Sequence, residues 1–153
     1  MTERTRSILF VSGQFALLAI ILFWPEGKEE ENLFEVALTL VGLTLTAVGV
    51  AVLLLSLVGL GRSLTASPIP KGDAKLVTRG FYKYMRHPIY TGLLTFALGV
   101  GLDAGIPQLI FVAALFVLIN RKARWEEELL MQRYPEYAEY MSKTPRFLPR
   151  LKG

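Results

Sequence analysis

The chain has 153 residues, of which 52% are hydrophobic and 20% are charged, and its formal net charge is +4. Its 17 basic and 13 acidic side chains all lie outside four long apolar stretches. Helices of an ordinary soluble domain carry charges along the face that contacts water, so this distribution excludes such a domain, and it excludes a disordered chain as well. The lack of cysteine and the single histidine, His87, exclude disulfides, thiolate chemistry and a histidine-rich metal site. In chain order the uncharged stretches are Ser7–Trp24, Val36–Gly61, Pro88–Leu102 and Ala104–Asn120.

The first two stretches are predicted to be membrane-spanning helices. Crossing the hydrocarbon core takes roughly 20 apolar residues, which the first stretch approaches and the second exceeds. Arg4 and Arg6 precede the first stretch, as in a signal peptide, but no small-residue cleavage site follows it, so we expect a retained anchor helix. In the second stretch, small residues at helical spacing predict the close approach of a neighbouring helix: Gly42, Thr46, Gly49 and Ser56.

The other two stretches are predicted to form a helical hairpin. Residues 88–120 hold one charge, Asp103, near their centre, and Asp103–Pro107 is a turn signal. Two short helices therefore fit this segment better than one long span. We expect the second helix to continue out of the membrane to about Tyr134, after which three prolines break up the tail: Pro135, Pro145 and Pro149.

The distribution of Lys and Arg predicts how these helices are oriented. If successive connections alternate between the two sides of the membrane, 16 of the 17 basic residues lie on one side, which the positive-inside rule makes the cytoplasm. The sequence thus predicts an all-α integral membrane bundle of about four spans, with both termini cytoplasmic. We expect a single domain, 1–153, with two spanning helices over 1–61 and a site-bearing core over 62–153. The small positive net charge is the sum of a strongly basic cytoplasmic side and an acidic opposite side, and it does not imply nucleic-acid binding.

Two polar segments, 62–90 and 121–150, are expected to meet at one membrane face, because the hairpin between them returns the chain to the side it left. Channels, pumps and proton-coupled transporters carry charged groups at membrane depth, whereas these spans hold Asp103 at the hairpin tip and tyrosine near one interface. The sequence therefore predicts a site at the cytoplasmic interface.

His87 is the first candidate residue of that site. Pro88 suits the first turn of a helix, so His87 would lie beside unpaired backbone N–H groups at the positive end of the helix dipole. Such a place binds carboxylates and phosphates, and the charge of Arg86 would strengthen it. The alternative is a basic, aromatic belt of the kind that membrane proteins carry at the interface, followed in the second segment by a positive cluster and a solvated helix.

The two polar segments also carry two ordered motifs. The first is Arg86-His-Pro-Ile-Tyr90-Thr-Gly92, with the lead-in Leu76-Val-Thr-Arg-Gly80-Phe-Tyr82. The second comprises Glu126-Glu127, Leu130, Tyr134-Pro135, Tyr137, Tyr140 and Thr144-Pro-Arg-Phe-Leu-Pro149. Together they resemble the isoprenylcysteine carboxyl methyltransferase and phospholipid methyltransferase superfamily over residues 70–150, with Pro135 where the family has glycine.

The resemblance implies an integral-membrane methyltransferase that uses S-adenosylmethionine, releases S-adenosylhomocysteine and needs no metal. Its cofactor would lie at the cytosolic interface between the two motifs. The implied cofactor-binding residues are Leu76, Val77, Tyr82, His87, Pro88, Tyr90, Glu126 and Glu127. The residues implied to face the cofactor carboxylate or the acceptor are Arg86, Arg121 and Arg124, with Lys122 as an alternative to the two arginines before the glutamate pair.

Catalysis of methyl transfer could rest on proximity and a dry site, so no catalytic residue is assigned. Arg86, His87 and Glu127 are the candidates, and His87 or Glu127 could take the proton of an amine acceptor. The acceptor stays open between an isoprenylcysteine carboxylate, a phospholipid amine and another small lipid, each reaching the site from the bilayer.

Two other functions stay open. Membrane sterol and steroid reductases that use NADPH have a related architecture, but they show asparagine and glutamate where this chain has Ile89 and Leu93. The other is a non-catalytic membrane scaffold with a basic cytoplasmic face.

Overall fold

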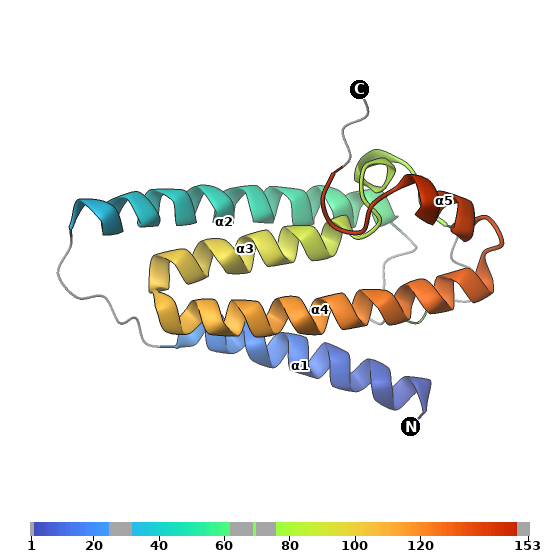
Figure 1. The fold of residues 1–153 in the computed structure, drawn as a ribbon, viewed down its shortest axis with the longest axis horizontal. Helices are drawn as coiled ribbons and strands as arrows, with labels where there is room; N and C mark the ends of the chain where they lie inside the picture. The colour runs from blue at the N-terminus through green and yellow to red at the C-terminus, as the bar shows by residue number, and fades with distance from the viewer. Residues whose placement is uncertain (1, 25–31, 62–68, 70–75, 150–153) are drawn as a thin grey trace.

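The computed structural model describes residues 2–24, 32–61, 69 and 76–149. Over these residues the fold is all-helical, as predicted, and four long helices run side by side (Figure 1). The elements are α1 (Glu3–Phe23), α2 (Leu33–Leu60), the short 3-10 helix η2 (Gly80–Lys83), α3 (Pro88–Ala104), α4 (Ile106–Arg133) and α5 (Tyr137–Lys143).

The predicted hairpin is confirmed as α3 and α4. Pro88 is the first residue of α3, where its missing N–H leaves no helical hydrogen bond unmade. Gly105 separates the two helices with a φ of 110°, a conformation that L side chains rarely adopt. The helix α4 runs to Arg133, one residue short of the predicted end.

The tail after α4 differs from the prediction, because the residues between Pro135 and Pro145 form the helix α5. This segment, Tyr137–Lys143, holds no proline, so one proline precedes the helix and the other follows it without removing a helical hydrogen bond. The prolines therefore bound a short helix instead of preventing one.

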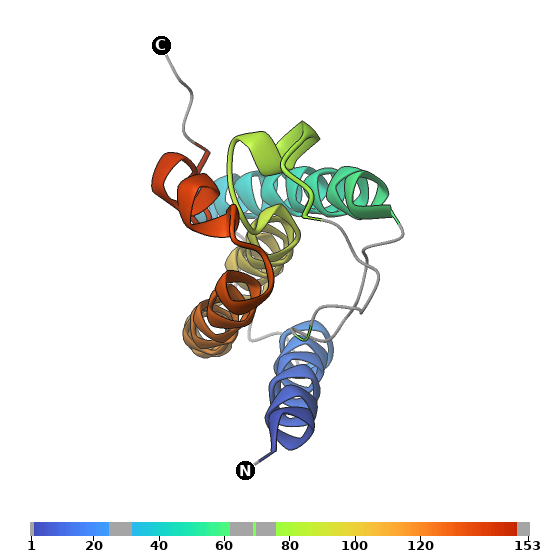
Figure 2. The same ribbon diagram turned by 90° about the vertical axis from the view of Figure 1, so that its right-hand side faces the viewer.

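The helices α2 and α3 pack with their backbones in close approach, and Figure 2 shows them adjacent at one side of the bundle. Gly42, Gly49 and Ser56 of α2 are buried, which confirms the predicted contact face. A Cβ atom on Gly99 would lie 2.5 Å from the carbonyl oxygen of Gly42, and one on Gly92 would lie 2.7 Å from the backbone nitrogen of Leu53. Small residues on both helices thus allow a separation that larger side chains would prevent.

The helix α1 lies on the opposite side of the α3–α4 hairpin from α2 (Figures 1 and 2). It packs mainly against α4, and the buried apolar cluster joins all three of α1, α3 and α4. The members of this cluster are Leu18, Ile21, Leu93, Ala97, Val112, Leu115 and Ile119. The hairpin is therefore the centre of the fold.

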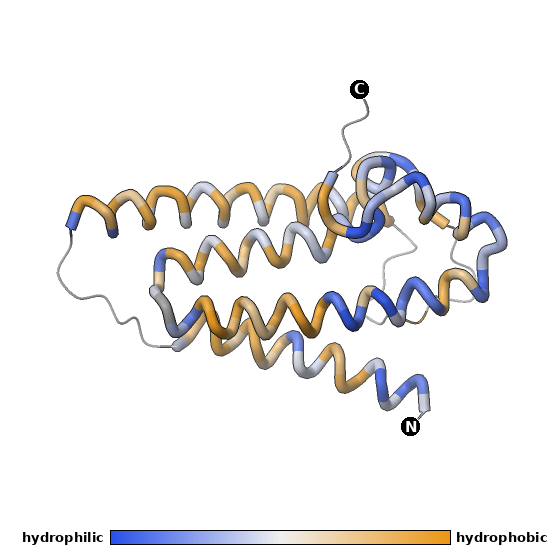
Figure 3. Tube along the Cα trace, in the orientation of Figure 1, coloured by the Kyte–Doolittle hydropathy of each residue, from blue (hydrophilic) through white to orange (hydrophobic). Residues whose placement is uncertain are grey.

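Most of the apolar surface of α1 and α2 is exposed. Both helices are long and apolar enough to cross a membrane, and only 17% of each apolar window is buried, whereas the core helix of a soluble protein is mostly buried. Exposed apolar faces of this extent are typical of contact with lipid. Polar residues instead gather over the second half of α4, η2 and α5, at one end of the bundle (Figure 3).

Candidate functional site at the polar end of the bundle

The two polar segments meet at one end of the bundle, as the hairpin argument predicted. The backbone N–H groups of Arg86 and His87 donate to the carbonyl oxygens of Pro145 and Arg146, at 2.9 and 3.0 Å. The hydroxyl of Thr91 donates to the carbonyl oxygen of Phe147 at 2.8 Å. The start of α3 is therefore fastened to residues 144–148, which we call the C-terminal strap.

Three predicted cofactor-binding residues, His87, Tyr90 and Glu126, lie together at this junction. The phenol of Tyr90 donates to Oε2 of Glu126 at 2.7 Å, and the rings of His87 and Tyr90 stack with centroids 5.2 Å apart. Nδ1 of the buried His87 lies 3.9 Å from the same carboxylate oxygen. An acceptor-only carboxylate beside two aromatic faces is suited to a ligand that is cationic and donates hydrogen bonds.

Tyr82, from the short helix η2, extends this group. Its side chain is buried, and the phenol of Tyr140 donates to its carbonyl oxygen at 2.5 Å. Burial, together with the charge of Glu126, raises the pKa of Tyr82 well above its ordinary value. Burial also raises the pKa of Tyr140 to about 12. Both phenols therefore stay neutral hydrogen-bond donors across the physiological pH range.

Glu127 has a different environment from Glu126, although the two are adjacent. Its Oε1 accepts from Nε of Arg86 and Nε of Arg146, each at 3.0 Å, and is hydrogen-bonded with Nε2 of His87 at 3.1 Å. Its Oε2 accepts from Nη2 of Arg146 at 2.6 Å. Burial alone would raise the pKa of Glu127, but the hydrogen bonds from His87 and Arg146 and the charge of Arg86 outweigh it, so the pKa lies well below its usual value. A carboxylate held in this way is a poor proton acceptor.

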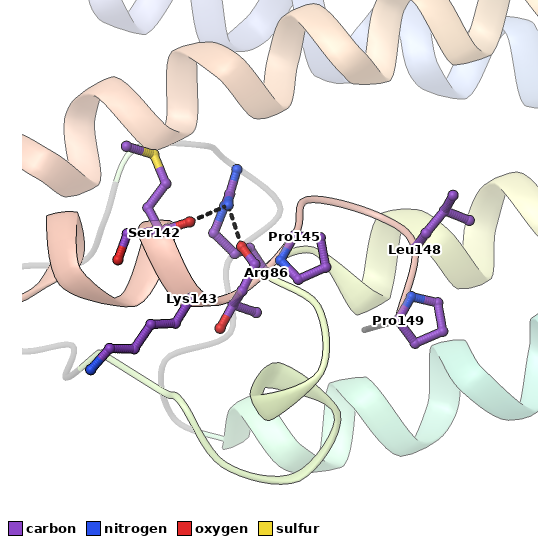
Figure 4. Close-up of a pocket in the computed structure, with 8 residues that line it drawn as sticks. Arg86, Ser142, Lys143, Pro145, Leu148 and Pro149 are labelled. Carbon is purple, nitrogen blue, oxygen red and sulfur yellow. Dashed lines mark hydrogen bonds between the residues drawn. The ribbon is translucent and has the colours of Figure 1, made fainter. Parts of the chain in front are cut away.

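Arg86 is similarly engaged. Its guanidinium bonds Glu127 through Nε and Nη2, while Nη1 donates to the carbonyl oxygens of Met141, at 3.0 Å, and Thr144. Figure 4 shows it at one wall of a cavity of about 350 Å³ formed by α5 and the C-terminal strap. This cavity lies on the strap side of Arg86, and neither Tyr90 nor Glu126 lines it. The structure thus joins Arg86 to the strap.

The remaining predicted site residues divide by burial. Pro88 is buried, and Leu76 and Val77 are partly buried on the approach to η2. Arg121 and Arg124, by contrast, are exposed and have no hydrogen bond or ion pair with any residue that the structure describes. Their proposed contact with an acceptor stays a prediction.

Two residues are central in the structure although neither was expected in the cofactor site: Lys122, the alternative to the arginines before the glutamate pair, and Arg146. Lys122 is buried, its Nζ donates to Oε1 of Gln14 in α1 at 2.7 Å, and it lies 5.0 Å from the ring centre of Tyr90. Its position four residues before Glu126 was a signal for a shared helix face. Arg146 stands inside the quoted tail motif, but its distance in sequence from Glu127 hid the pairing.

In the described part of the chain, no three His, Cys, Asp or Glu side chains are placed to hold a metal ion. The residues brought together by η2, the start of α3 and the second half of α4 are polar and aromatic: Tyr82, His87, Tyr90 and Glu126.

Comparison with known proteins assigns the family. The sequence pattern of the phospholipid methyltransferase family matches residues 37–137. The chain is 33% identical to a probable protein-S-isoprenylcysteine O-methyltransferase of Oryza sativa subsp. indica, over 95% of this chain and 81% of that protein. It is 38% identical to a cobalt-zinc-cadmium resistance protein of Cupriavidus metallidurans, over 50% of this chain and 36% of that protein.

The fold is also similar to a solved structure, that of the eukaryotic intramembrane Ras methyltransferase, isoprenylcysteine carboxyl methyltransferase. The TM-score is 0.66 at 20% sequence identity, and the match covers 98% of this chain and 54% of that one. This chain thus spans about half the length of the solved structure, over which the helical arrangement is shared. Sequence and fold agree: the chain belongs to the isoprenylcysteine carboxyl methyltransferase and phospholipid methyltransferase superfamily and is an integral-membrane methyltransferase.

Proposed function

We propose that the protein transfers a methyl group from S-adenosylmethionine to a lipophilic acceptor at the cytosolic face of the membrane. The observation that carries this proposal is the meeting of His87 and Tyr90, at the start of α3, with Glu126 on α4. Neither segment offers the site alone, and they come together at the polar end of an otherwise apolar bundle.

The residues present fit S-adenosylmethionine chemically. The carboxylate of Glu126, which accepts a hydrogen bond from Tyr90, can also accept from the ammonium group of the cofactor, and the ring face of Tyr82 can contact its sulfonium. We propose that Leu76, Val77 and Pro88 supply apolar and backbone contacts beside them. Glu127, which is engaged by Arg86, His87 and Arg146, would act through His87 and not bind the cofactor itself.

The bound cofactor supplies an activated methyl group, and the chain's own residues bind, orient and exclude water. Alignment of donor and acceptor can provide a large part of the rate enhancement for a displacement of this kind. Because Glu127 is held ionised among cationic partners, it is unsuited to deprotonate an acceptor. An acceptor that is already a nucleophile, such as a carboxylate, needs no base.

For the acceptor we propose the carboxylate of an S-isoprenylated cysteine, the substrate class in the name of the Oryza sativa relative. The buried ammonium of Lys122, beside Tyr90, is placed to attract that carboxylate. Arg121 and Arg124, which are exposed, would instead contact it only if the acceptor reaches over the outer face of α4. Lys122→Met should then raise the KM for the acceptor more than Arg121→Gln or Arg124→Gln does.

We also propose four membrane spans with both termini cytoplasmic, on the basis of the Lys and Arg distribution. Since the chain contains no cysteine, single cysteines can be introduced and labelled from either side of a sealed membrane. Cysteines introduced at positions 3 and 139 should react from the cytoplasmic side. Reaction of either one from the opposite side would contradict this topology.

Calorimetry on the purified protein tests the cofactor. S-Adenosylmethionine and S-adenosylhomocysteine should bind and raise the unfolding temperature. Binding of NADPH in their place would support a reductase, and binding of none of the three would support a scaffold. Glu126→Ala should weaken binding without unfolding the protein, with Glu128→Ala on the exposed face of the same helix as the matched control.

Transfer of a labelled methyl group tests the acceptor. An S-farnesylated cysteine should be labelled as a base-labile ester, whereas the same compound with its carboxylate blocked should not. Labelling of phosphatidylethanolamine in lipid vesicles would instead identify an amine acceptor.

A further inference from the structure

We propose that Arg146 is a positioning residue: through Glu127 it holds His87 with the proton on Nε2, which leaves Nδ1 as a hydrogen-bond acceptor facing Glu126. The effect of this arrangement on methyl-donor binding rests on the proposed function, whereas the protonation pattern of the ring does not.

Arg146 holds the carboxylate of Glu127 with two hydrogen bonds. Its Nε and Nη2 contact both oxygens of Glu127, at 3.0 and 2.6 Å, which is the bidentate fork that fixes the plane of a carboxylate. Its Nη1 donates to Oδ1 of Asn120 at 2.9 Å, so the guanidinium is tied to α4 at a second point. Arg86, by comparison, contacts one oxygen of Glu127. Arg146 is thus the side chain that sets the orientation of the carboxylate.

The carboxylate in turn decides which nitrogen of His87 carries a proton. Oε1 of Glu127 receives donors from two arginines, so it is an ionised acceptor with no proton to give. Nε2 of His87, at 3.1 Å from that oxygen, must therefore be the donor. When the ring is neutral, Nδ1 is left with a lone pair.

The backbone supports the same arrangement. The N–H of His87 donates to the carbonyl oxygen of Arg146 at 3.0 Å, and Phe147 packs against the His87 ring with centroids 6.2 Å apart. Residues of the C-terminal strap therefore hold the main chain of His87 directly and its ring through Glu127. The strap and the second half of α4 act together on one imidazole.

The consequence for the site is a pair of acceptors. Nδ1 of His87 and Oε2 of Glu126 lie 3.9 Å apart, and we assign the methyl donor to the place beside them. Two acceptors at this separation favour a ligand group that donates two hydrogen bonds, as an ammonium does. Nothing in this arrangement requires Arg146 to touch the ligand.

The protein's single histidine makes the experiment direct. Histidine labelled with 15N, incorporated into the full chain in nanodiscs, gives signals from one imidazole. In the neutral ring we expect the proton on Nε2 and none on Nδ1. Arg146→Gln should introduce the other tautomer and weaken S-adenosylmethionine binding on the order of tenfold, the loss expected for a charge-assisted hydrogen-bond pair. Arg146→Lys keeps the positive charge but cannot form the bidentate fork, so it should not restore the wild-type tautomer.

Lys143→Gln is the matched control, because Lys143 is a nearby exposed cation paired with the exposed Glu139. It should change neither the tautomer nor the affinity. A wild-type ring that keeps its proton on Nδ1 overturns the proposal without any variant, and so does a folded Arg146→Gln protein with both wild-type readouts. If Arg146→Gln does not fold, the wild-type spectrum still decides. Failure to bind S-adenosylmethionine with the predicted tautomer present would count against the proposed function alone.

Discussion

The α2–α3 contact and the polar end of the bundle are stabilised by different means. Between α2 and α3, glycines bring two backbones together, and the contact depends on the absence of side-chain volume. At the polar end, Glu127 is buried among Arg86, His87 and Arg146, and the contact depends on matched charge and hydrogen bonding. The stability of the α2–α3 contact should therefore depend on side-chain size and not on pH. The stability of the polar end should depend on charge and pH.

The largest effect is expected from removing the central charge of the polar end. Glu127→Ala leaves the guanidinium groups of Arg86 and Arg146 without their carboxylate, at a cost of about 3–5 kcal/mol in the free energy of unfolding. Thermal unfolding in detergent measures this loss. Glu128→Ala, on the exposed face of α4, should change stability little. Equal effects of the two substitutions would contradict the burial of charge at position 127.

The next largest effect concerns size in the α2–α3 contact. Gly49→Ala places a methyl group less than 3.0 Å from the backbone of Phe96, and the resulting strain should cost about 1–3 kcal/mol. Gly59→Ala is the control in the same helix, since its methyl group meets only the side chain of Tyr82 at 3.9 Å. The same unfolding assay compares them. Tolerance of Gly49→Ala equal to that of Gly59→Ala would argue against the close backbone approach.

A smaller effect is expected from a single hydroxyl at the site. Tyr90→Phe removes the hydrogen bond to Glu126 and should lower stability by about 1 kcal/mol, while weakening the binding of S-adenosylmethionine. Tyr84→Phe, at a position 41% exposed, is the control. Calorimetric affinities that do not distinguish the two variants would remove Tyr90 from the site.

The smallest effect is expected from mild acid. Because the pKa of Glu127 is lowered in the folded protein, its contribution to stability is complete above the unfolded carboxyl pKa of about 4.3 and is lost as the pH falls below it. Between pH 7 and pH 4 the loss is about 1 kcal/mol or less. Glu127→Gln should flatten this part of the pH profile, whereas Gly49→Ala should leave its slope unchanged.

Much of the fold could be predicted because the relevant signals are local in the chain. Pro88 marks the start of α3, Gly105 lies in the turn of the hairpin, and the spacing of Gly42 and Gly49 indicates a helix contact face. Which helix fills that contact was not predictable, since the complementary glycines, Gly92 and Gly99, lie in a separate stretch with its own reasons to be apolar. The helix α5 was missed because three prolines in the tail suggested irregular chain.

The sequence by itself determined the apolar stretches, the hairpin and the meeting of two polar segments at one end of the bundle, because hydropathy, proline and charge act over short distances along the chain. The tertiary structure alone decided what the adjacent Glu126 and Glu127 do. They lie on one helix, but Glu126 faces Tyr90 while Glu127 faces the strap and is neutralised by Arg86 and Arg146. The sequence identifies an ionisable side chain, but its partners, burial and protonation depend on which distant segments the fold brings beside it.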